Sequence, residues 1–257
     1  GTNSGVTPTI AIDTTNNKAL IIADNDSATP SSILTLYRCN LDATGCTQTD
    51  LSTPLGLGAD SAQRPEIIID SVNQKIIIAT TDSSIAATLR LLRCELDGTG
   101  CTTTDVCADS GEGNACAQRA QLAIDTVNNK IVISGANGNS ANSLSVYRCD
   151  LDLTNCSHTD VAGNLGLIGG TGNQSSLALE FLTNMLLVAV RDNTNNNKLS
   201  LFRCDLDATN CTYTDISAGQ GNFSGKQPSI VVDTTNYNLL VVTENGDNGN
   251  RPGLFLQ

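Results

Sequence analysis

An Arg-Cys motif recurs along the chain at a fixed spacing, and this spacing limits the fold more than any other feature. With the two residues before it, its four copies are Leu36-Tyr37-Arg38-Cys39, Leu91-Leu92-Arg93-Cys94, Val146-Tyr147-Arg148-Cys149 and Leu201-Phe202-Arg203-Cys204. Each copy lies 55 residues after the previous one. A fixed period of this length is typical of folds built from repeated supersecondary units. The chain of 257 residues has room for four whole repeats and part of a fifth.

A second motif, an apolar run that ends in an acidic residue, recurs in the same register. Its five copies cover residues 10–13, 67–70, 122–125, 177–180 and 230–233. In the second repeat, a turn-like segment at 71–74 separates this run from another apolar run at 75–80, which predicts a β-hairpin. A third strand at 89–96 and a fourth at 101–106 follow. Each whole repeat is therefore expected to hold four antiparallel strands.

Repeated four-stranded units with long polar connections predict an all-β, five-bladed β-propeller. A β-helix has far shorter coils, and a two-sheet sandwich has no reason to keep the period. We expect a single propeller domain over residues 1–257. Its blades are predicted at approximately 6–50, 63–105, 118–160, 173–215 and 226–257.

The turn between the third and fourth strands has the same residue types at two positions in all four repeats. The residue before the second cysteine of each copy is Gly45, Gly100, Asn155 or Asn210. Glycine and asparagine are the residues that tolerate a positive φ, so this position is predicted to be left-handed. Three residues earlier stand Asp42, Asp97, Asp152 and Asp207, whose carboxylates are expected to accept hydrogen bonds from turn amides.

All ten cysteines fall into five close pairs. The pairs are Cys39 and Cys46, Cys94 and Cys101, Cys107 and Cys116, Cys149 and Cys156, and Cys204 and Cys211. Zinc sites would require CxxC knuckles or histidines beside the cysteines, and neither occurs. We therefore predict local disulfides that pin individual hairpins, no metal, and a secreted or cell-surface protein.

The hairpin also resembles a known propeller family. The segment Arg93-Cys94-Glu95-Leu96-Asp97-Gly98 is similar to the YWTD-type repeats of lipoprotein-receptor ectodomains, whose third strand ends in Arg followed by Leu-Asp-Gly. The aromatic signature of that family's second strand is missing here, and the blade count differs. The resemblance implies a propeller architecture and no particular function.

The fifth blade is expected to be incomplete. Its last residues, Leu254, Phe255, Leu256 and Gln257, align with residues 199–202 and stop before the Arg-Cys of the hairpin. Three interpretations remain open: a short blade that lies exposed, a fragment of a longer protein, or a blade completed by a strand from a neighbouring chain. Since open strand edges favour pairing with other chains, residues 254–257 are a candidate assembly edge.

The sequence offers few sets of residues that could form a catalytic site. The single histidine, His158, occupies a position where other repeats have Gln48, Thr103 or Tyr213, which predicts a surface site on the outer strand. The repeated acids could supply the paired carboxylates of a glycosidase, but each begins a turn that explains it locally. These acids are Asp13, Asp70, Asp125, Glu180 and Asp233.

Two further sets of charged residues have local explanations. The repeated arginines are expected to pair across strands with Asp50, Asp105, Asp160 and Asp215, although a basic binding stripe is an alternative. Residues 24–26 and 244–247 offer oxygen ligands suited to calcium, but neither has the EF-hand pattern. We therefore predict no cofactor, with calcium as the alternative.

If a small-molecule site exists, propeller geometry places it where the inner strands begin. The candidate residues at this channel mouth are Gln63, Arg64, Gln118, Arg119, Gln174, Lys226 and Gln227. They could bind a polar ligand, or they could satisfy backbone groups at the start of each strand, and we favour the second interpretation.

The amino-acid composition narrows the range of functions that the protein could have. A net charge of −12 with 14 Lys and Arg argues against nucleic acid, and no apolar run is long enough to insert into a membrane. The absence of Trp weakens a lectin-like sugar site, since such sites rely on aromatic faces. We expect a non-catalytic extracellular module for surface assembly or adhesion with protein partners or copies of itself. Binding of glycans or small ligands is the alternative, and a hydrolase comes last.

Asn-x-Ser/Thr sequences are possible sites of glycosylation in a suitable secretory system. They occur at Asn25, Asn155, Asn173, Asn210 and Asn222.

Overall fold

A computed structural model gives the fold of the chain. It describes residues 4–25, 33–58, 60–85, 87–167, 169–217, 225–233, 235–236, 238–245 and 251–256. These residues form two compact units: unit one holds residues 1–115 and 149–156, and unit two holds residues 116–148 and 157–257. Each unit is considered by itself below.

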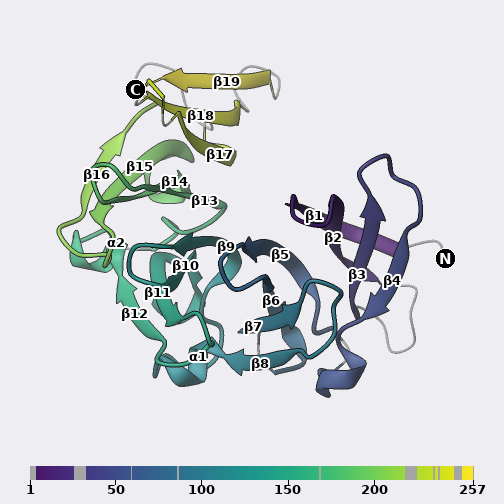
Figure 1. The fold of residues 1–257 in the computed structure, drawn as a ribbon. Coiled ribbons are helices and arrows are strands. Elements are labelled where there is room, and N and C mark those ends of the chain that lie inside the picture. Colours follow the sequence, from purple (N-terminus) through teal and green to yellow (C-terminus); the bar gives the residue numbers. More distant parts are fainter. Residues whose placement is uncertain are drawn as a thin grey trace. The chain divides into compact units, whose positions relative to one another are not determined.

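The described chain is almost entirely strand, arranged in five consecutive antiparallel sheets (Figure 1). The strands are β1 (Ser4–Asp13), β2 (Lys18–Asn25), β3 (Ile33–Asn40), β4 (Thr47–Asp50), β5 (Gln63–Asp70), β6 (Lys75–Asp82), β7 (Thr88–Glu95), β8 (Thr102–Asp105), β9 (Gln118–Asp125), β10 (Lys130–Asn137), β11 (Ser143–Asp150), β12 (Ser157–Asp160), β13 (Ser175–Glu180), β14 (Met185–Asp192), β15 (Lys198–Asp205), β16 (Thr212–Asp215), β17 (Lys226–Asp233), β18 (Asn238–Asn245) and β19 (Arg251–Leu256). Blades one to four have four strands each, in sequence order, and blade five has three, β17-β18-β19. The predicted five-bladed β-propeller is confirmed. That all five blades form one domain stays a prediction.

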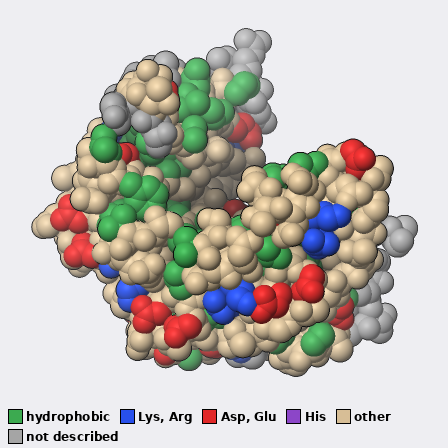
Figure 2. All heavy atoms as spheres, viewed as in Figure 1, with side chains coloured by type: hydrophobic (Ala, Val, Ile, Leu, Met, Phe, Trp, Pro, Cys, Tyr) green, Lys and Arg blue, Asp and Glu red, His purple; other side chains and the backbone are tan. Residues whose placement is uncertain are grey.

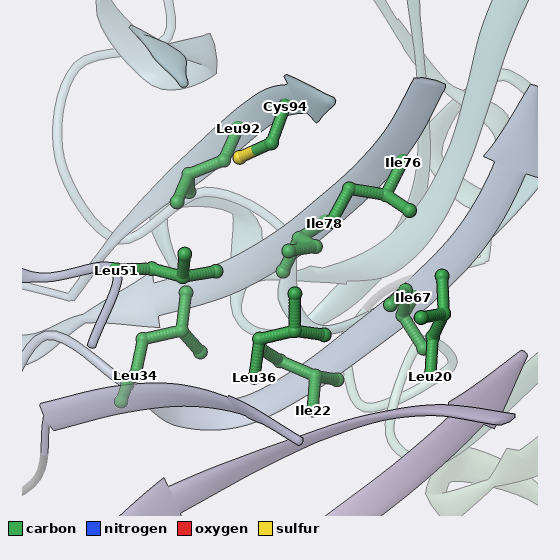
Figure 3. Packing of buried hydrophobic residues seen from close by; sticks show 11 residues of the cluster. Leu20, Ile22, Leu34, Leu36, Leu51, Ile67, Ile76, Ile78, Leu92 and Cys94 are labelled. Carbon is green, nitrogen blue, oxygen red and sulfur yellow. The ribbon is translucent and has the colours of Figure 1, made fainter. Parts of the chain in front are cut away.

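The core of unit one lies between the sheets of blades one and two (Figure 3). Leu20, Ile22 and Leu36 point from blade one toward Ile67 and Ile78 of blade two, and all five side chains are buried. Every residue of β6 from Ile76 to Asp82 is buried, so both faces of this strand are covered, which explains its apolar run instead of alternating polarity.

Unit two repeats the same packing at two junctions. Val132 and Val146 of blade three lie in one cluster with Leu186 and Phe202 of blade four. The second cluster joins blades four and five, and its buried members are Leu187, Ala189, Leu199, Leu201, Ile230, Leu239 and Val241.

The predicted hairpin disulfides are present. Cys39–Cys46, Cys94–Cys101, Cys149–Cys156 and Cys204–Cys211 each join residues seven apart, Cys107 and Cys116 are also disulfide-bonded, and no described cysteine is free. Disulfides are typical of proteins outside the cytosol.

The turn inside each disulfide loop has the predicted backbone. The φ angles are 59° at Gly45, 57° at Gly100, 52° at Asn155 and 48° at Asn210. A second left-handed position, two residues earlier, was not predicted, because Ala43, Leu153 and Ala208 carry no sequence signal for it. The predicted aspartates accept from the turn: Asp97 Oδ1, for example, accepts from the N–H (2.9 Å) and hydroxyl (2.7 Å) of Thr99.

Short helical turns occupy the connections between strands. They are η1 (Thr53–Leu55), η2 (Ser83–Ile85), α1 (Val106–Asp109), η3 (Gly138–Ser140), α2 (Val161–Asn164) and η4 (Asn193–Asn195). The aspartate that ends a fourth strand caps α1 and α2: Asp105 accepts from Ala108 N–H at 3.1 Å, and Asp160 accepts from Gly163 N–H at 2.8 Å. Such N-caps satisfy helix-end amides, and this role was not predicted for these residues.

The register of blade five corrects the predicted alignment of its last residues. Leu254 pairs with Val242, just as Leu201 pairs with Ala189, so Leu254 is equivalent to Leu201 and the prediction was two residues out. Leu256 consequently occupies the place of the repeated arginine. The prediction failed because it matched Leu254 and Leu256 to Leu199 and Leu201, whereas the strand pairs make Leu254 and Phe255 equivalent to Leu201 and Phe202.

None of the helices in the described part of the chain is long and apolar enough to cross a membrane.

Candidate functional site

The residues predicted at the start of the inner strands share an unusual backbone. Arg64 (φ 50°), Arg119 (57°), Gln174 (56°) and Gln227 (45°) are all left-handed, as is the equivalent Thr7 (46°). In β5, β9 and β17 the strand register shifts next to this residue, which marks a β-bulge. The repeated position is therefore a structural device at the entry to each inner strand.

Within unit two, the structure joins some of these side chains. Gln174 Oε1 accepts a hydrogen bond from the backbone N–H of Gln227 at 3.1 Å, and Lys226 forms an ion pair with Glu244 at 3.4 Å. Gln118 and Arg119 are half-buried at the start of β9, whereas Gln63 and Arg64 of unit one are exposed. The Gln174 contact fits the interpretation that these side chains satisfy backbone groups, and ligand binding there stays a prediction.

The repeated acids at the ends of the inner strands are engaged in their own turns. Asp70 Oδ1 accepts from Asn73 N–H at 3.1 Å, and Asp70 Oδ2 accepts from the Asn73 side chain at 2.7 Å. Asp13, Asp125 and Asp233 make the same pair of contacts with the asparagine three residues later. Glu180 instead accepts from the Thr183 hydroxyl, which contributes most to the lowered pKa of its carboxyl, and from the Leu182 and Thr183 amides, which lower it further. These acids thus have a local structural role.

Arg148, one of the repeated arginines, differs from its predicted pairing. Arg148 lies 3.4 Å from Asp125 in its own blade, not beside Asp160. Asp105 pairs with Arg90 at 3.6 Å, and Asp215 pairs with Lys198 at 3.3 Å. The prediction failed because each fourth-strand acid lies opposite the early part of the third strand, as Asp105 lies opposite Arg90, whereas the repeated arginine comes three residues later, as Arg93 lies opposite Thr102.

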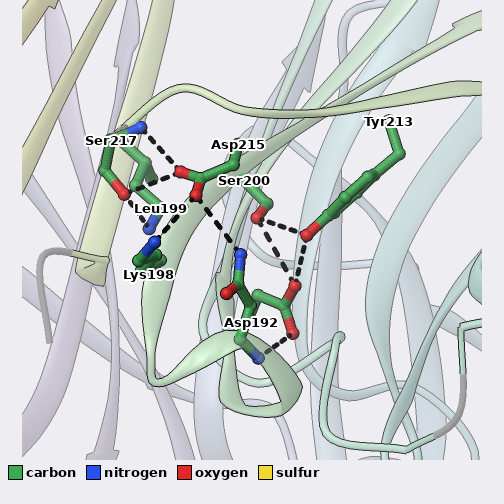
Figure 4. Close-up of polar contacts among 8 residues, drawn as sticks. Asp192, Lys198, Leu199, Ser200, Tyr213, Asp215 and Ser217 are labelled. Carbon is green, nitrogen blue, oxygen red and sulfur yellow. Dashed lines mark hydrogen bonds and ion pairs between the residues drawn. The ribbon is translucent and has the colours of Figure 1, made fainter. Parts of the chain in front are cut away.

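A buried polar cluster lies between the second, third and fourth strands of blade four (Figure 4). The Tyr213 hydroxyl donates to Asp192 Oδ2 at 2.7 Å, and Ser200 Oγ lies 3.2 Å from the Tyr213 oxygen. Burial, reinforced by the neighbouring Asp192, raises the pKa of Tyr213. Asp192 also accepts from Thr194 N–H and so holds the start of η4.

The equivalent place in blade three holds the only histidine. His158 Nε2 lies 3.0 Å from Ser145 Oγ, and its ring lies 4.9 Å from that of Tyr147. His158 lies on the outer strand β12, as predicted, and its side chain is half-buried against the sheet. A serine beside a histidine could act as a nucleophile, but Ser145 is fully buried and no substrate could reach it. The pair therefore has a structural role.

Metal binding finds no support in the part of the chain that is described. It contains no group of three or more His, Cys, Asp or Glu residues able to hold a metal ion. Of the proposed calcium loops, Asp26, Gly246 and Asp247 lie outside the described residues.

The candidate glycosylation sites differ in exposure. Asn155 and Asn210 are exposed at hairpin turns, where their side chains donate to Asp150 (2.7 Å) and Asp205 (2.8 Å). Asn173 is half-buried and Asn25 is buried, while Asn222 lies outside the described residues. Glycosylation at any of them stays a prediction.

The candidate assembly edge is strand β19. It pairs with β18 from Arg251 to Leu256, and the three-stranded sheet of blade five ends on it. Leu254 is 62% exposed, whereas Phe255 packs into the core between blades four and five. The side chain of Leu256 and all of Gln257 lie outside what is described.

Strand β19 has a proline, Pro252, at a position where other third strands use an outward N–H. In the complete blades, the N–H of the equivalent residue points toward the segment after the fourth strand: Leu34 donates to Ser52 Oγ at 2.8 Å, and Leu199 donates to Ser217 Oγ at 3.1 Å. The equivalent in β19 is Pro252, which pairs with Glu244 and has no N–H to leave unsatisfied. The next four residues, 253–256, correspond to residues 200–203, which pair with the four-residue strand β16.

On the face drawn in Figure 2, Lys and Arg side chains form small separate groups, several of them beside Asp and Glu side chains.

No protein-family model matches the chain, and no curated protein matches its sequence. Several solved structures are similar in fold. An exo-β-1,3-galactanase from Phanerochaete chrysosporium has a TM-score of 0.58 and 10% identity over 98% of this chain, which spans 60% of the galactanase chain. The catalytic domain of the Coprinopsis cinerea GH62 α-L-arabinofuranosidase has a TM-score of 0.58 and 8% identity, over 99% of this chain and 89% of that one.

A third similar structure is a glycoside hydrolase family 43 arabinoxylan arabinofuranohydrolase from Bacillus subtilis, in complex with cellotetraose. Its TM-score is 0.52 with 10% identity, over 99% of this chain and 63% of that one. At this identity the likeness concerns the fold alone and supports the five-bladed propeller. The YWTD resemblance stays a prediction.

Proposed function

We propose that this protein is a non-catalytic, extracellular interaction module for surface assembly or adhesion, and that its binding edge is strand β19. The observation that carries the proposal is the three-stranded sheet of blade five, where the other four blades each add a fourth strand beside their third. An extended segment of another chain would pair with residues 253–256 by strand addition.

The local chemistry of β19 supports this mode of binding. Because N–H directions alternate along a strand, the outward donors that follow Pro252 are those of Leu254 and Leu256. The exposed Leu254 side chain would contact a neighbouring side chain of the added strand, a type of pair that contributes about 0.2 to 1 kcal/mol. The engagement of the repeated acids in turns, and the burial of Ser145, support the absence of catalysis.

Electron microscopy and sedimentation velocity of the protein test the proposal. We expect regular filaments, arrays or concentration-dependent association, and we expect Leu254→Pro to abolish it. This substitution removes one outward N–H but leaves the pairing with β18, and Leu254→Val, which keeps both the donor and the apolar side chain, should behave as wild type. A monomer at every concentration, equally sized in all three proteins, would overturn the proposal.

Carbohydrate binding is the second candidate function. The fold favours it, because the similar solved structures include an exo-β-1,3-galactanase and an α-L-arabinofuranosidase, both of which act on carbohydrates. A glycan array decides between the two: tight binding of a defined glycan by a monodisperse monomer would replace assembly with a lectin-like function.

A further inference from the structure

Two surface cavities occupy equivalent places in the repeat, each between two complete four-stranded blades. Groove one, of about 390 Å³, lies in unit one between the end of β4 with η1 and the hairpin turn before β8. Groove two, of about 330 Å³, lies in unit two between the end of β12 with α2 and the hairpin turn before β16. Both volumes are within the range of ligand pockets. The lining positions that they share are Thr49 and Thr159, Leu55 and Leu165, Thr99 and Thr209, and Cys101 and Cys211.

The junction of blades two and three has a side chain of the protein itself at this place. Asp109, at the end of α1, reaches the hairpin of blade three, where its Oδ2 accepts a hydrogen bond from the N–H of Cys156 at 2.8 Å. Both residues belong to unit one. Cys156 is 8% exposed, whereas its equivalents Cys101 and Cys211 are half-buried. At this junction the chain therefore supplies a carboxylate that covers the hairpin amide.

The residue in the same place supplies no carboxylate to either groove. Counted from the aspartate that ends each fourth strand, the equivalent of Asp109 is Pro54 at groove one and Asn164 at groove two, and each lines its groove. Proline has no side-chain acceptor, and the side chain of Asn164 is uncharged and exposed. Both grooves therefore keep open the space that the Asp109 carboxylate fills in blade two.

The donor that Asp109 uses is repeated in both grooves. Strands β8 and β16 pair with their third strands in the same register as β12, so Cys101 and Cys211 stand, like Cys156, one residue before the fourth strand. In unit two the N–H of Ile216 donates to the carbonyl of Leu199 at 3.1 Å. Because N–H directions alternate along a strand, the N–H of Cys211 faces away from β15. A carboxylate bonds to such a donor about twice as strongly as a neutral acceptor does.

The acid beside groove one is compatible with a bound carboxylate. Asp50 lines this groove, but its oxygens accept from the amide (3.1 Å) and the hydroxyl (2.6 Å) of Thr53. The equivalent Asp105 accepts from the N–H of Ala108 at 3.1 Å, and Asp109 is accommodated in the same turn. Among the described residues that line groove two, none is acidic.

We infer that the two grooves are carboxylate-binding sites that each fit the side chain of an aspartate, held by the N–H of Cys101 in groove one and of Cys211 in groove two. The methylene group of the ligand packs on Leu55 or Leu165, which stand where blade two has Ser110. Neither groove includes a residue of β19, so both sites stand or fall independently of strand addition there.

Amide resonances of the isotope-labelled whole protein, titrated near neutral pH and at constant ionic strength, test these sites. The probe is aspartate with both backbone ends capped, and capped asparagine is the control of the same shape. We expect saturable downfield shifts of the Cys101 and Cys211 amides but not of the Cys156 amide, whose acceptor is Asp109. Capped asparagine should bind several-fold more weakly. Equal binding of the two probes, or no saturable shift in the folded protein, would overturn the inference, and tighter binding of glucuronate would overturn the assignment to aspartate.

Matched variants place or remove the carboxylate of the chain itself. Pro54→Asp should abolish the response of the Cys101 amide and leave that of Cys211, and Asn164→Asp should do the reverse. Blade two carries aspartate at this position, so both variants should melt near the wild-type temperature. Asp109→Ala should add a third response, at the Cys156 amide. A Cys101 shift that persists in folded Pro54→Asp, or a Cys156 amide that stays silent in folded Asp109→Ala, would overturn the inference.

Discussion

At the scale of single residues, the carboxylates of the hairpin turns make the stability of the fold depend on pH. Hydrogen bonds from Thr99 lower the pKa of Asp97 below its ordinary 3.8, and those from Thr44 do the same for Asp42. A carboxyl whose pKa is lower in the folded state stabilises the fold above its unfolded pKa, and this stabilisation is lost as the pH falls through the folded pKa.

Thr99→Val removes the hydroxyl that donates to Asp97. We expect it to lower the melting temperature near neutral pH, and the difference from wild type should vanish as the pH falls below the lowered pKa, because Asp97 is then protonated in both proteins. Thermal melts followed by circular dichroism from pH 7 to about 2 measure this. A difference that stays constant over the whole range would show that the hydroxyl acts through packing instead.

Gly100 carries the backbone requirement of the same turn. Its φ is 57°, and a Cβ built there would meet Glu95 at an ordinary 3.5 Å, so strain and not space limits the substitution. Gly100→Val should destabilise the protein by about 1 to 2 kcal/mol, the cost of a left-handed β-branched residue. Gly100→Asn should be nearly neutral, since Asn155 and Asn210 occupy this place in other blades. Equal melting temperatures for the two variants would contradict the backbone explanation.

At the scale of the element, each hairpin is a closed loop with a disulfide between residues seven apart. Replacing Cys94 and Cys101 together by serine should cost about 2 to 3 kcal/mol, the value expected for so short a loop. Denaturant titrations measure the loss. The single variant Cys94→Ser is the less useful comparison, because it leaves a reactive thiol at Cys101.

The same hairpin shows which features of the structure can be predicted from the sequence. The 55-residue period predicted the blades, the disulfides and the left-handed Gly or Asn, because each depends on residues close together in the chain. The predicted partner of Arg148 and the predicted alignment of residues 254–257 were wrong, since both depend on which residues face each other across strands.

At the scale of the whole molecule, the hairpin disulfides together rival the stability of an ordinary domain. Four loops at about 2.5 kcal/mol each contribute roughly 10 kcal/mol, while domains are typically stable by about 5 to 15 kcal/mol. The hairpins are separate in sequence, so their contributions should nearly add. We therefore expect full reduction to unfold the protein at room temperature, seen as a loss of β-sheet circular dichroism in step with the thiol count. A reduced protein that still melts cooperatively within a few degrees of the oxidised one would mean that blade packing alone holds the fold, and that an oxidising compartment is not required for it.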